Sequence, residues 1–155
     1  MPHTLRDEIR QKRPFASRLE ETSLNIVRTA AVLTDSFDQM VKPWGLTSAQ
    51  YNVLRILRGA EPKGLCRNEV RDRMLTRAPD MTRLLDRMEE AGIVARTRDT
   101  EDRRMVTARI TSKGLGTLVE LNSAVAGHHR RHLGHLSEAQ LETLIELLTL
   151  IREAE

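Results

Sequence analysis

Residues 78–114 constrain the fold of this chain more than any other segment of its sequence. Apolar side chains recur there at intervals of three and four residues, at Met81, Leu84, Leu85 and Met88. This spacing puts them on one face of an amphipathic helix from Pro79 to Ala91. Proline suits the first turn of a helix, and Gly92 suits the position just past its last turn. The segment therefore predicts a helix with one buried face.

A short β-hairpin is predicted directly after this helix. Apolar and polar residues alternate around Val94 and again from Val106 to Ile110, which indicates two strands. The loop between them, Arg98 to Arg104, holds three arginines and three acids. Thr111 can cap a further helix. This order is that of a recognition helix and its wing in a winged helix-turn-helix, a shape that puts a helix in the DNA major groove.

These elements resemble the MarR (multiple antibiotic resistance regulator) family of bacterial transcription factors. The matching motifs are Thr82-Arg83-Leu84-Leu85-Asp86-Arg87, Glu90-Ala91-Gly92-Ile93-Val94, Arg98-Asp99-x-x-Asp102-Arg103-Arg104 and Ile110-Thr111-x-x-Gly114. The family usually has leucine where this chain has Ile110. The resemblance implies a mostly α-helical fold with a small β-hairpin wing, in which a winged helix-turn-helix is flanked by N- and C-terminal dimerisation helices.

The rest of the chain fits this plan. Residues 1–16 are polar and are expected to form a flexible N-terminus. Residues 17–45 and 111–155 are expected to form the helical dimerisation region, and residues 46–110 the winged helix-turn-helix DNA-binding domain. A near-heptad seam predicts a long helix from about residue 17 to 41.

Shorter signals place the remaining helices. Capping boxes predict helices that begin after Thr47 and after Ser137. A short helix is expected from about Arg67 to Met74, with Leu75 turned inward. The final helix is apolar on more than one face, which leaves two interpretations: it is wedged inside its own chain, or it packs on a partner chain. We favour the dimer interface, because a single neighbour would leave a large apolar patch exposed.

Composition narrows the class of protein. The chain has 155 residues, a formal net charge of +3 and a pI of about 9.5, which permits nucleic-acid binding without demonstrating it. One cysteine excludes an internal disulfide framework and suits a cytoplasmic location. No apolar run approaches the length of a membrane span, and no secretory signal is visible. No catalytic motif stands out, so an enzyme is not expected.

Basic and short polar residues of the predicted helices and wing are the candidates for contact with double-stranded DNA. Arg83 and Arg87 lie four residues apart, and their mutual repulsion is relieved if phosphates lie nearby. The full candidate set is Arg67, Asn68, Arg77, Pro79, Asp80, Thr82, Arg83, Arg98, Arg103 and Arg104. The resemblance implies that Asp99 and Asp102 brace the wing, paired with arginine. It also implies that Arg103 or Arg104 enters the minor groove, and the choice between these two stays open.

The resemblance further implies a homodimer on a pseudo-palindromic operator, acting as a ligand-responsive repressor. No cofactor is required, but a small aromatic or anionic effector is expected between the dimer-forming helices and the winged domain. The candidate pocket residues offer flat apolar surface and one cation: Phe37, Met40, Trp44, Tyr51 and Arg55. Ordinary core packing is the competing interpretation of these residues.

Three alternatives stay open. His128 and His132 lie four residues apart on a predicted helix, a spacing that can hold a metal ion, although neighbouring arginines oppose a cation. Cys66 lies beside Arg67 near a helix start, where thiols are more readily oxidised. In these first two alternatives, the chain is a metal- or redox-responsive regulator of the same fold. The third alternative is a winged-helix module that binds another protein and not DNA.

Overall fold

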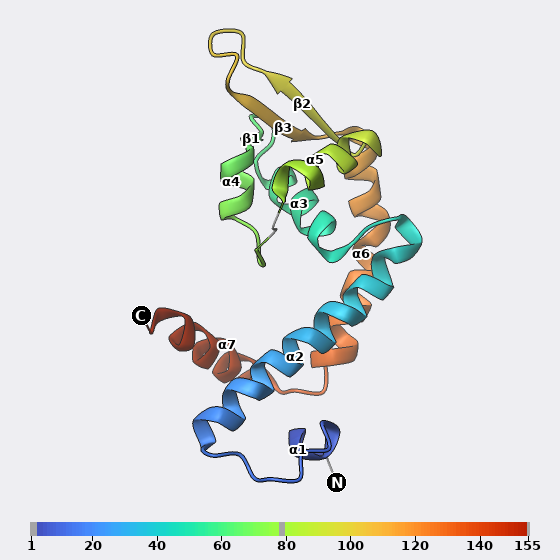
Figure 1. Ribbon diagram of the computed structural model, residues 1–155. Helices are drawn as coiled ribbons and strands as arrows, with labels where there is room; N and C mark the ends of the chain where they lie inside the picture. The colour runs from blue at the N-terminus through green and yellow to red at the C-terminus, as the bar shows by residue number, and fades with distance from the viewer. Residues whose placement is uncertain (1–2, 78–79, 155) are drawn as a thin grey trace. The chain divides into compact units, whose positions relative to one another are not determined.

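The computed structural model describes residues 3–77 and 80–154 (Figure 1). The helix start predicted at Pro79, and the DNA contact predicted for that residue, lie outside the described residues. The chain divides into two compact units, residues 1–37 and 38–155. Each unit is described by itself.

The first unit contains the helix α1 (Leu5–Glu8) and most of α2 (Arg18–Val41). A capping box forms α1: the Thr4 hydroxyl accepts from the Asp7 amide at 3.4 Å, and the Asp7 carboxylate accepts from the Thr4 amide at 3.1 Å. No helix was predicted in this segment. The long helix predicted over residues 17–41 is confirmed.

The second unit begins with the end of α2, the 3-10 helix η1 (Lys42–Trp44) and α3 (Ser48–Gly59). The predicted capping box of α3 is confirmed, because the Thr47 hydroxyl accepts from the Gln50 amide at 3.2 Å. Next come α4 (Arg67–Asp72) and α5 (Met81–Glu90). The inward position predicted for Leu75 is wrong, since its side chain is 86% exposed. The reason is that α4 ends at Asp72, so Leu75 lies in the turn that follows, where its amide donates to Asn52 at 2.8 Å.

The sheet is antiparallel, with strand order β1–β3–β2. Both predicted strands are confirmed as β2 (Val94–Arg98) and β3 (Val106–Ile110). β1 (Leu65–Cys66) pairs with β3 and was not predicted, because two residues give no alternating pattern. Gly64 precedes β1 with φ +76°, and a Cβ there would lie 2.5 Å from the Ala108 carbonyl oxygen. Only glycine therefore allows the chain to approach β3 so closely.

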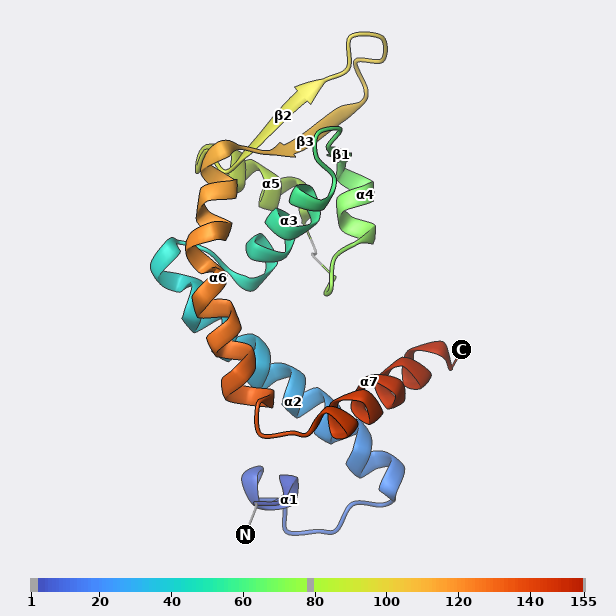
Figure 2. The same cartoon turned by 180° about the vertical axis from the view of Figure 1, so that it is seen from behind.

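The core of this unit lies between α3, α5, α6 (Ser112–Leu133) and the sheet. The apolar stripe predicted for α5 is confirmed: Met81, Leu85 and Met88 are buried and Leu84 is half-buried. Gly92 ends α5 as predicted, with φ +75° and its amide donating to the Glu89 carbonyl at 2.9 Å. Figure 2 shows α6 running along α3 on the side away from α4. Packed side chains thus hold α5 on the face opposite its exposed residues.

The last helix, α7 (Glu138–Glu153), begins at the predicted capping box, where the Ser137 hydroxyl accepts from the Gln140 amide at 3.3 Å. No residue of α7 is buried. The interpretation in which this helix is wedged inside its own chain is therefore wrong. Its exposed apolar side chains are Leu144, Ile145, Leu147, Leu150 and Ile151. None of the described helices combines the length and the apolar character that a bilayer crossing needs.

Candidate nucleic-acid interface

The exposed face of α5 carries the central residues of the predicted interface. Asp80 caps the helix, and its carboxylate accepts from the Arg83 amide at 2.9 Å. Because α5 buries the opposite face, the side chains of Thr82 and Arg83 are exposed. A carboxylate suits a helix N-terminus but repels phosphate, so the capping contact accounts for Asp80 without DNA. Its contact with DNA stays a prediction.

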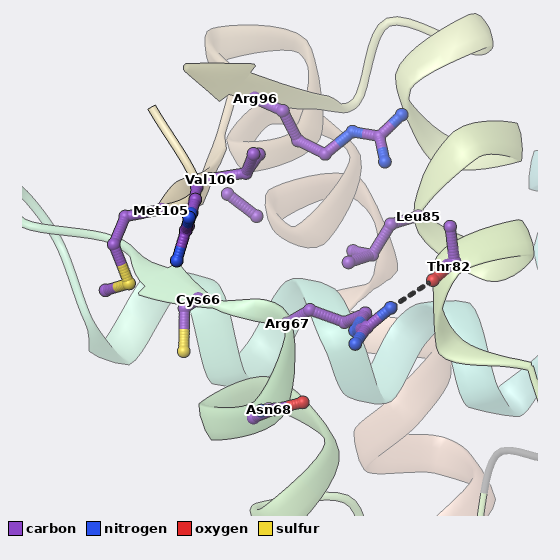
Figure 3. A pocket seen from close by; sticks show the side chains of 10 residues that line it. Cys66, Arg67, Asn68, Thr82, Leu85, Arg96, Met105 and Val106 are labelled. Atoms are coloured by element: carbon purple, nitrogen blue, oxygen red, sulfur yellow. Dashed lines mark hydrogen bonds between the residues drawn. The ribbon is translucent and has the colours of Figure 1, made fainter. Parts of the chain in front are cut away.

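The first turn of α4 lies against this face. Arg67 Nη1 donates to Thr82 Oγ1 at 2.9 Å, and Figure 3 shows the two side chains facing one another across the gap between α4 and α5. Asn68 is exposed beside Arg67, and Arg77 is exposed in the turn between the two helices. The structure thus brings together residues that are up to 15 positions apart in the sequence.

The wing loop is held by its two aspartates. Asp99 Oδ1 accepts from the amides of Glu101 at 2.7 Å and Asp102 at 3.3 Å. Asp102 Oδ1 accepts from the Arg104 amide at 3.0 Å. These partners are backbone amides, and no ion pair of the described residues joins either aspartate to an arginine. The brace predicted as an aspartate–arginine pair is therefore replaced here by a network of backbone hydrogen bonds.

The side chains of the wing arginines are consequently not paired with these acids. Arg98, Arg103 and Arg104 are all exposed, and none of them forms an ion pair within residues 3–77 and 80–154. In both views the β2–β3 hairpin extends beyond α4 and α5 (Figures 1 and 2). Which arginine enters a minor groove stays open.

An ion cluster between α5 and β2 was missed by the sequence analysis. Arg96 Nη2 lies 2.5 Å from Asp86 Oδ1 and 2.6 Å from Glu89 Oε2, and its Nε donates to Glu89 Oε2 at 2.9 Å. The hydrogen bond from Arg96 lowers the pKa of the Glu89 carboxyl. Alternation along β2 puts Arg96 on the same side as the buried Val94, which was the available signal. Its partners could not be named from this pattern, because Asp86 and Glu89 lie on another element, α5.

A cavity of about 340 Å³ lies between the recognition helix, the start of α4 and the hairpin (Figure 3). Its lining combines apolar side chains with three arginines. The lining residues are Cys66, Arg67, Asn68, Thr82, Leu85, Arg96, Arg104, Met105, Val106 and Ala108. The helix and the wing are therefore not joined by continuous packing near the start of α5.

The predicted effector residues do not line this cavity. In the second unit Met40, Trp44 and Tyr51 are half-buried and Arg55 is exposed, and Trp44 Nε1 donates to Glu120 Oε2 at 3.2 Å. Phe37, in the first unit, is half-buried. Their role as a pocket stays a prediction.

The two predicted metal ligands lie together on α6. The rings of His128 and His132 have centroids 4.6 Å apart, and His128 is only 7% exposed. Burial lowers the pKa of the His128 imidazole, and the neighbouring His132, His129 and Arg131 lower it further. Across the described part of the chain, no group of three or more His, Cys, Asp or Glu side chains is arranged to hold a metal ion. Cys66 is half-buried, and its amide donates to the Glu69 carboxylate at 2.8 Å.

An exposed polar face on α5 beside an arginine-bearing hairpin places this chain in the class of winged helix-turn-helix proteins, which bind DNA. Comparison of sequences narrows the class. A family model described as "MarR family" matches residues 44–105. The regulator MhqR of Bacillus subtilis is 26% identical over 118 residues, which cover 75% of this chain and 79% of MhqR.

Solved structures agree with this assignment. A MarR transcription factor from Planctomyces limnophilus is 38% identical, with a TM-score of 0.69, over 88% of this chain and 99% of that one. Sco3205 of Streptomyces coelicolor, crystallised in complex with DNA, has the same fold, with a TM-score of 0.79 at 20% identity over 92% of this chain and 91% of Sco3205. The chain belongs to the MarR family. It is a DNA-binding transcriptional regulator and not an enzyme.

Proposed function

We propose that the protein is a homodimeric repressor that binds a pseudo-palindromic operator and is released from it by a small effector. Each protomer inserts α5 into a major groove and lays its wing along the neighbouring minor groove. A dimer bound there blocks RNA polymerase sterically. The two recognition helices then lie about 34–36 Å apart, one turn of DNA.

The exposure of the candidate residues carries this proposal. Every described candidate for a DNA contact is solvent-exposed, although the residues come from α4, the turn after it, α5 and the wing: Arg67, Asn68, Arg77, Asp80, Thr82, Arg83, Arg98, Arg103 and Arg104. Eight of the nine are arginine, asparagine or threonine, whose side chains can donate hydrogen bonds. Six of these are arginines, which suit both phosphate and base-edge contacts. A surface that only packed on another protein would not need this concentration of cations.

The apolar surface of α7 supports the dimer. Its five exposed apolar side chains lie on a helix with no buried residue. In the other unit, α2 also exposes apolar side chains, among them Leu19 and Val27. Soluble chains rarely leave such surfaces open to water, so a second copy of the chain is the simplest cover for them.

Two proteins of the same fold support a small aromatic or anionic effector. CouR of Rhodococcus jostii was crystallised with p-coumaroyl-CoA, and DNA binding by BpsR of Bordetella bronchiseptica is regulated by 6-hydroxynicotinic acid. In this chain, Phe37, Met40, Trp44, Tyr51 and Arg55 are the proposed effector residues. Effector and operator would be negatively coupled, each weakening the binding of the other by the same factor.

Selection of bound sequences from a random DNA pool tests the proposal. We expect a two-fold symmetric consensus, bound by a dimer with an affinity that falls steeply as salt rises. Recovery of no consensus, with weak binding that barely responds to salt, would instead favour a module that binds another protein.

A further inference from the structure

Arg96 connects α5 to the wing through both its guanidinium group and its backbone amide. Its guanidinium contacts the carboxylates of Asp86 and Glu89, and its backbone amide donates to Glu89 Oε1 at 3.2 Å. Glu89 thus accepts hydrogen bonds from both the backbone and the side chain of one β2 residue. A side chain held at so many points has little freedom to rotate. The cluster therefore fixes the orientation of β2 relative to the C-terminal half of α5.

This cluster differs from an ordinary surface ion pair. Isolated pairs on the surface contribute little, because water screens them and two long side chains must be ordered. Here one arginine, 23% exposed, serves two carboxylates, and its planar fork suits such a network. The carboxylates themselves are 48% and 40% exposed, so the expected effect is on orientation more than on overall stability.

The cavity explains why orientation needs this cluster. Between the start of α5 and the hairpin lies the space of about 340 Å³ lined by Thr82, Arg96 and Arg104. The cavity interrupts the packing between the exposed end of α5 and the hairpin, although Leu85 and Ala108 at its base are buried in the core. Apolar contacts therefore leave part of the wing without support from α5. The ion cluster lies where α5 and β2 still touch, and it can set the angle between them.

We infer that Arg96 is a positioning residue that joins the recognition helix and the wing into one DNA-reading unit. The helix and the wing arginines then reach the DNA together, and binding does not have to order them separately. This inference rests on the proposed DNA interface, since it assigns no new contact with DNA. It predicts that Asp86 and Glu89, although acidic, favour operator binding.

Simple electrostatics predicts the opposite change in DNA affinity. Removing a carboxylate near a polyanion should tighten binding if charge alone matters. If the cluster positions the wing, removing the same carboxylate should weaken it. Glu90 provides the matched control, because it is an exposed acid on the same helix and forms no ion pair among the described residues.

The experiment compares four variants with wild type: Asp86→Asn, Glu89→Gln, the double variant that combines both, and the control Glu90→Gln. Affinity for the selected operator and for random DNA is measured across a salt series, well below the melting temperature of each protein. We expect Glu90→Gln to bind as wild type or slightly more tightly. The double variant should bind the operator roughly tenfold more weakly, a change typical of residues in one network. A double variant that binds the operator with the same affinity as Glu90→Gln would overturn the inference.

A second measurement separates positioning from general destabilisation. Arg104→Ala and Arg103→Ala are each combined with the double variant, because the wing contributes less once its position is lost. We expect either wing substitution that weakens binding in the wild-type protein to have little further effect in the double variant. Fully additive losses would overturn the inference even if the double variant melts earlier. If wild type itself selects no operator, the proposed function fails, and this outcome is distinct from a failed role for Arg96.

Discussion

Arg67 at the start of α4 donates a hydrogen bond of 2.9 Å to the hydroxyl of Thr82 on the exposed face of α5. The contact ties the two helices of the helix-turn-helix on the side that faces outward, whereas the core ties them on the other. Arginine has five N–H donors, so this bond leaves others for a phosphate. The Thr82 hydroxyl is therefore oriented before DNA arrives.

Replacing Thr82 with valine tests this orientation. Thr82→Val keeps the shape of the side chain and removes the acceptor, so operator affinity should fall about fivefold, close to the value of one hydrogen bond. Thr82→Ser is the control, since it keeps the hydroxyl and should bind nearly as wild type. Equal affinities for all three proteins would show that the Arg67–Thr82 contact has no part in binding.

The wing arginines should differ in what they read. Arg103→Ala and Arg104→Ala should each weaken binding, and a phosphate contact that is lost should reduce the salt slope by about one unit on any sequence. An arginine that enters the minor groove should instead lose preference for A·T pairs at the operator flanks. Affinities for operators with A·T and G·C flanks distinguish the two. Wild-type binding by both variants in moderate salt would remove the wing from the interface.

The exposed apolar face of α7 should be a subunit contact. Ile145→Glu puts a carboxylate into that face and should shift the protein towards monomer, measured by light scattering after size exclusion. Thr143→Glu is the matched control, because it adds the same charge to a polar position of the same helix. Dimers of equal stability in the two variants would argue against α7 as the interface.

Stability should fall in mild acid because of His128. Burial lowers the pKa of its imidazole in the folded chain, so the unfolded chain binds more protons between that value and the ordinary one near 6.5. The contribution of His128 is therefore fully present above about pH 6.5 and is lost as the pH falls towards the lowered pKa. Urea unfolding at several pH values should show the decline. His128→Leu should flatten it, while His135→Gln, at an exposed position that does not contribute to the shift, should not.

Sequence reasoning predicted the elements whose signals are local. The α5 stripe, the end of α5 at Gly92 and the caps at Thr47, Thr111 and Ser137 depend on residues within four positions of one another. The structure bears each of them out. Most of the candidate DNA residues could be named in the same way, because they lie in short segments of the sequence, residues 77–83 and 98–104.

The remaining features depend on contacts between elements. Arg96 meets Asp86 and Glu89 only after the chain reverses at Gly92, and nothing in the local pattern names those partners. β1 exists because β3 pairs with it. Leu75 was misplaced because the sequence does not show that α4 ends at Asp72, three residues before it.

The central claim, that the exposed face of α5 reads DNA, is tested most directly at Arg83. The measurement is the affinity of wild type and Arg83→Ala for operator and random DNA across a salt series, with thermal melts as control. A bidentate contact with guanine contributes roughly 1–3 kcal/mol, so operator affinity should fall about 5- to 150-fold. The melting temperature should stay the same, because the side chain points away from the core. Unchanged affinity for both DNAs, in a variant that melts like wild type, would contradict the proposed docking of α5.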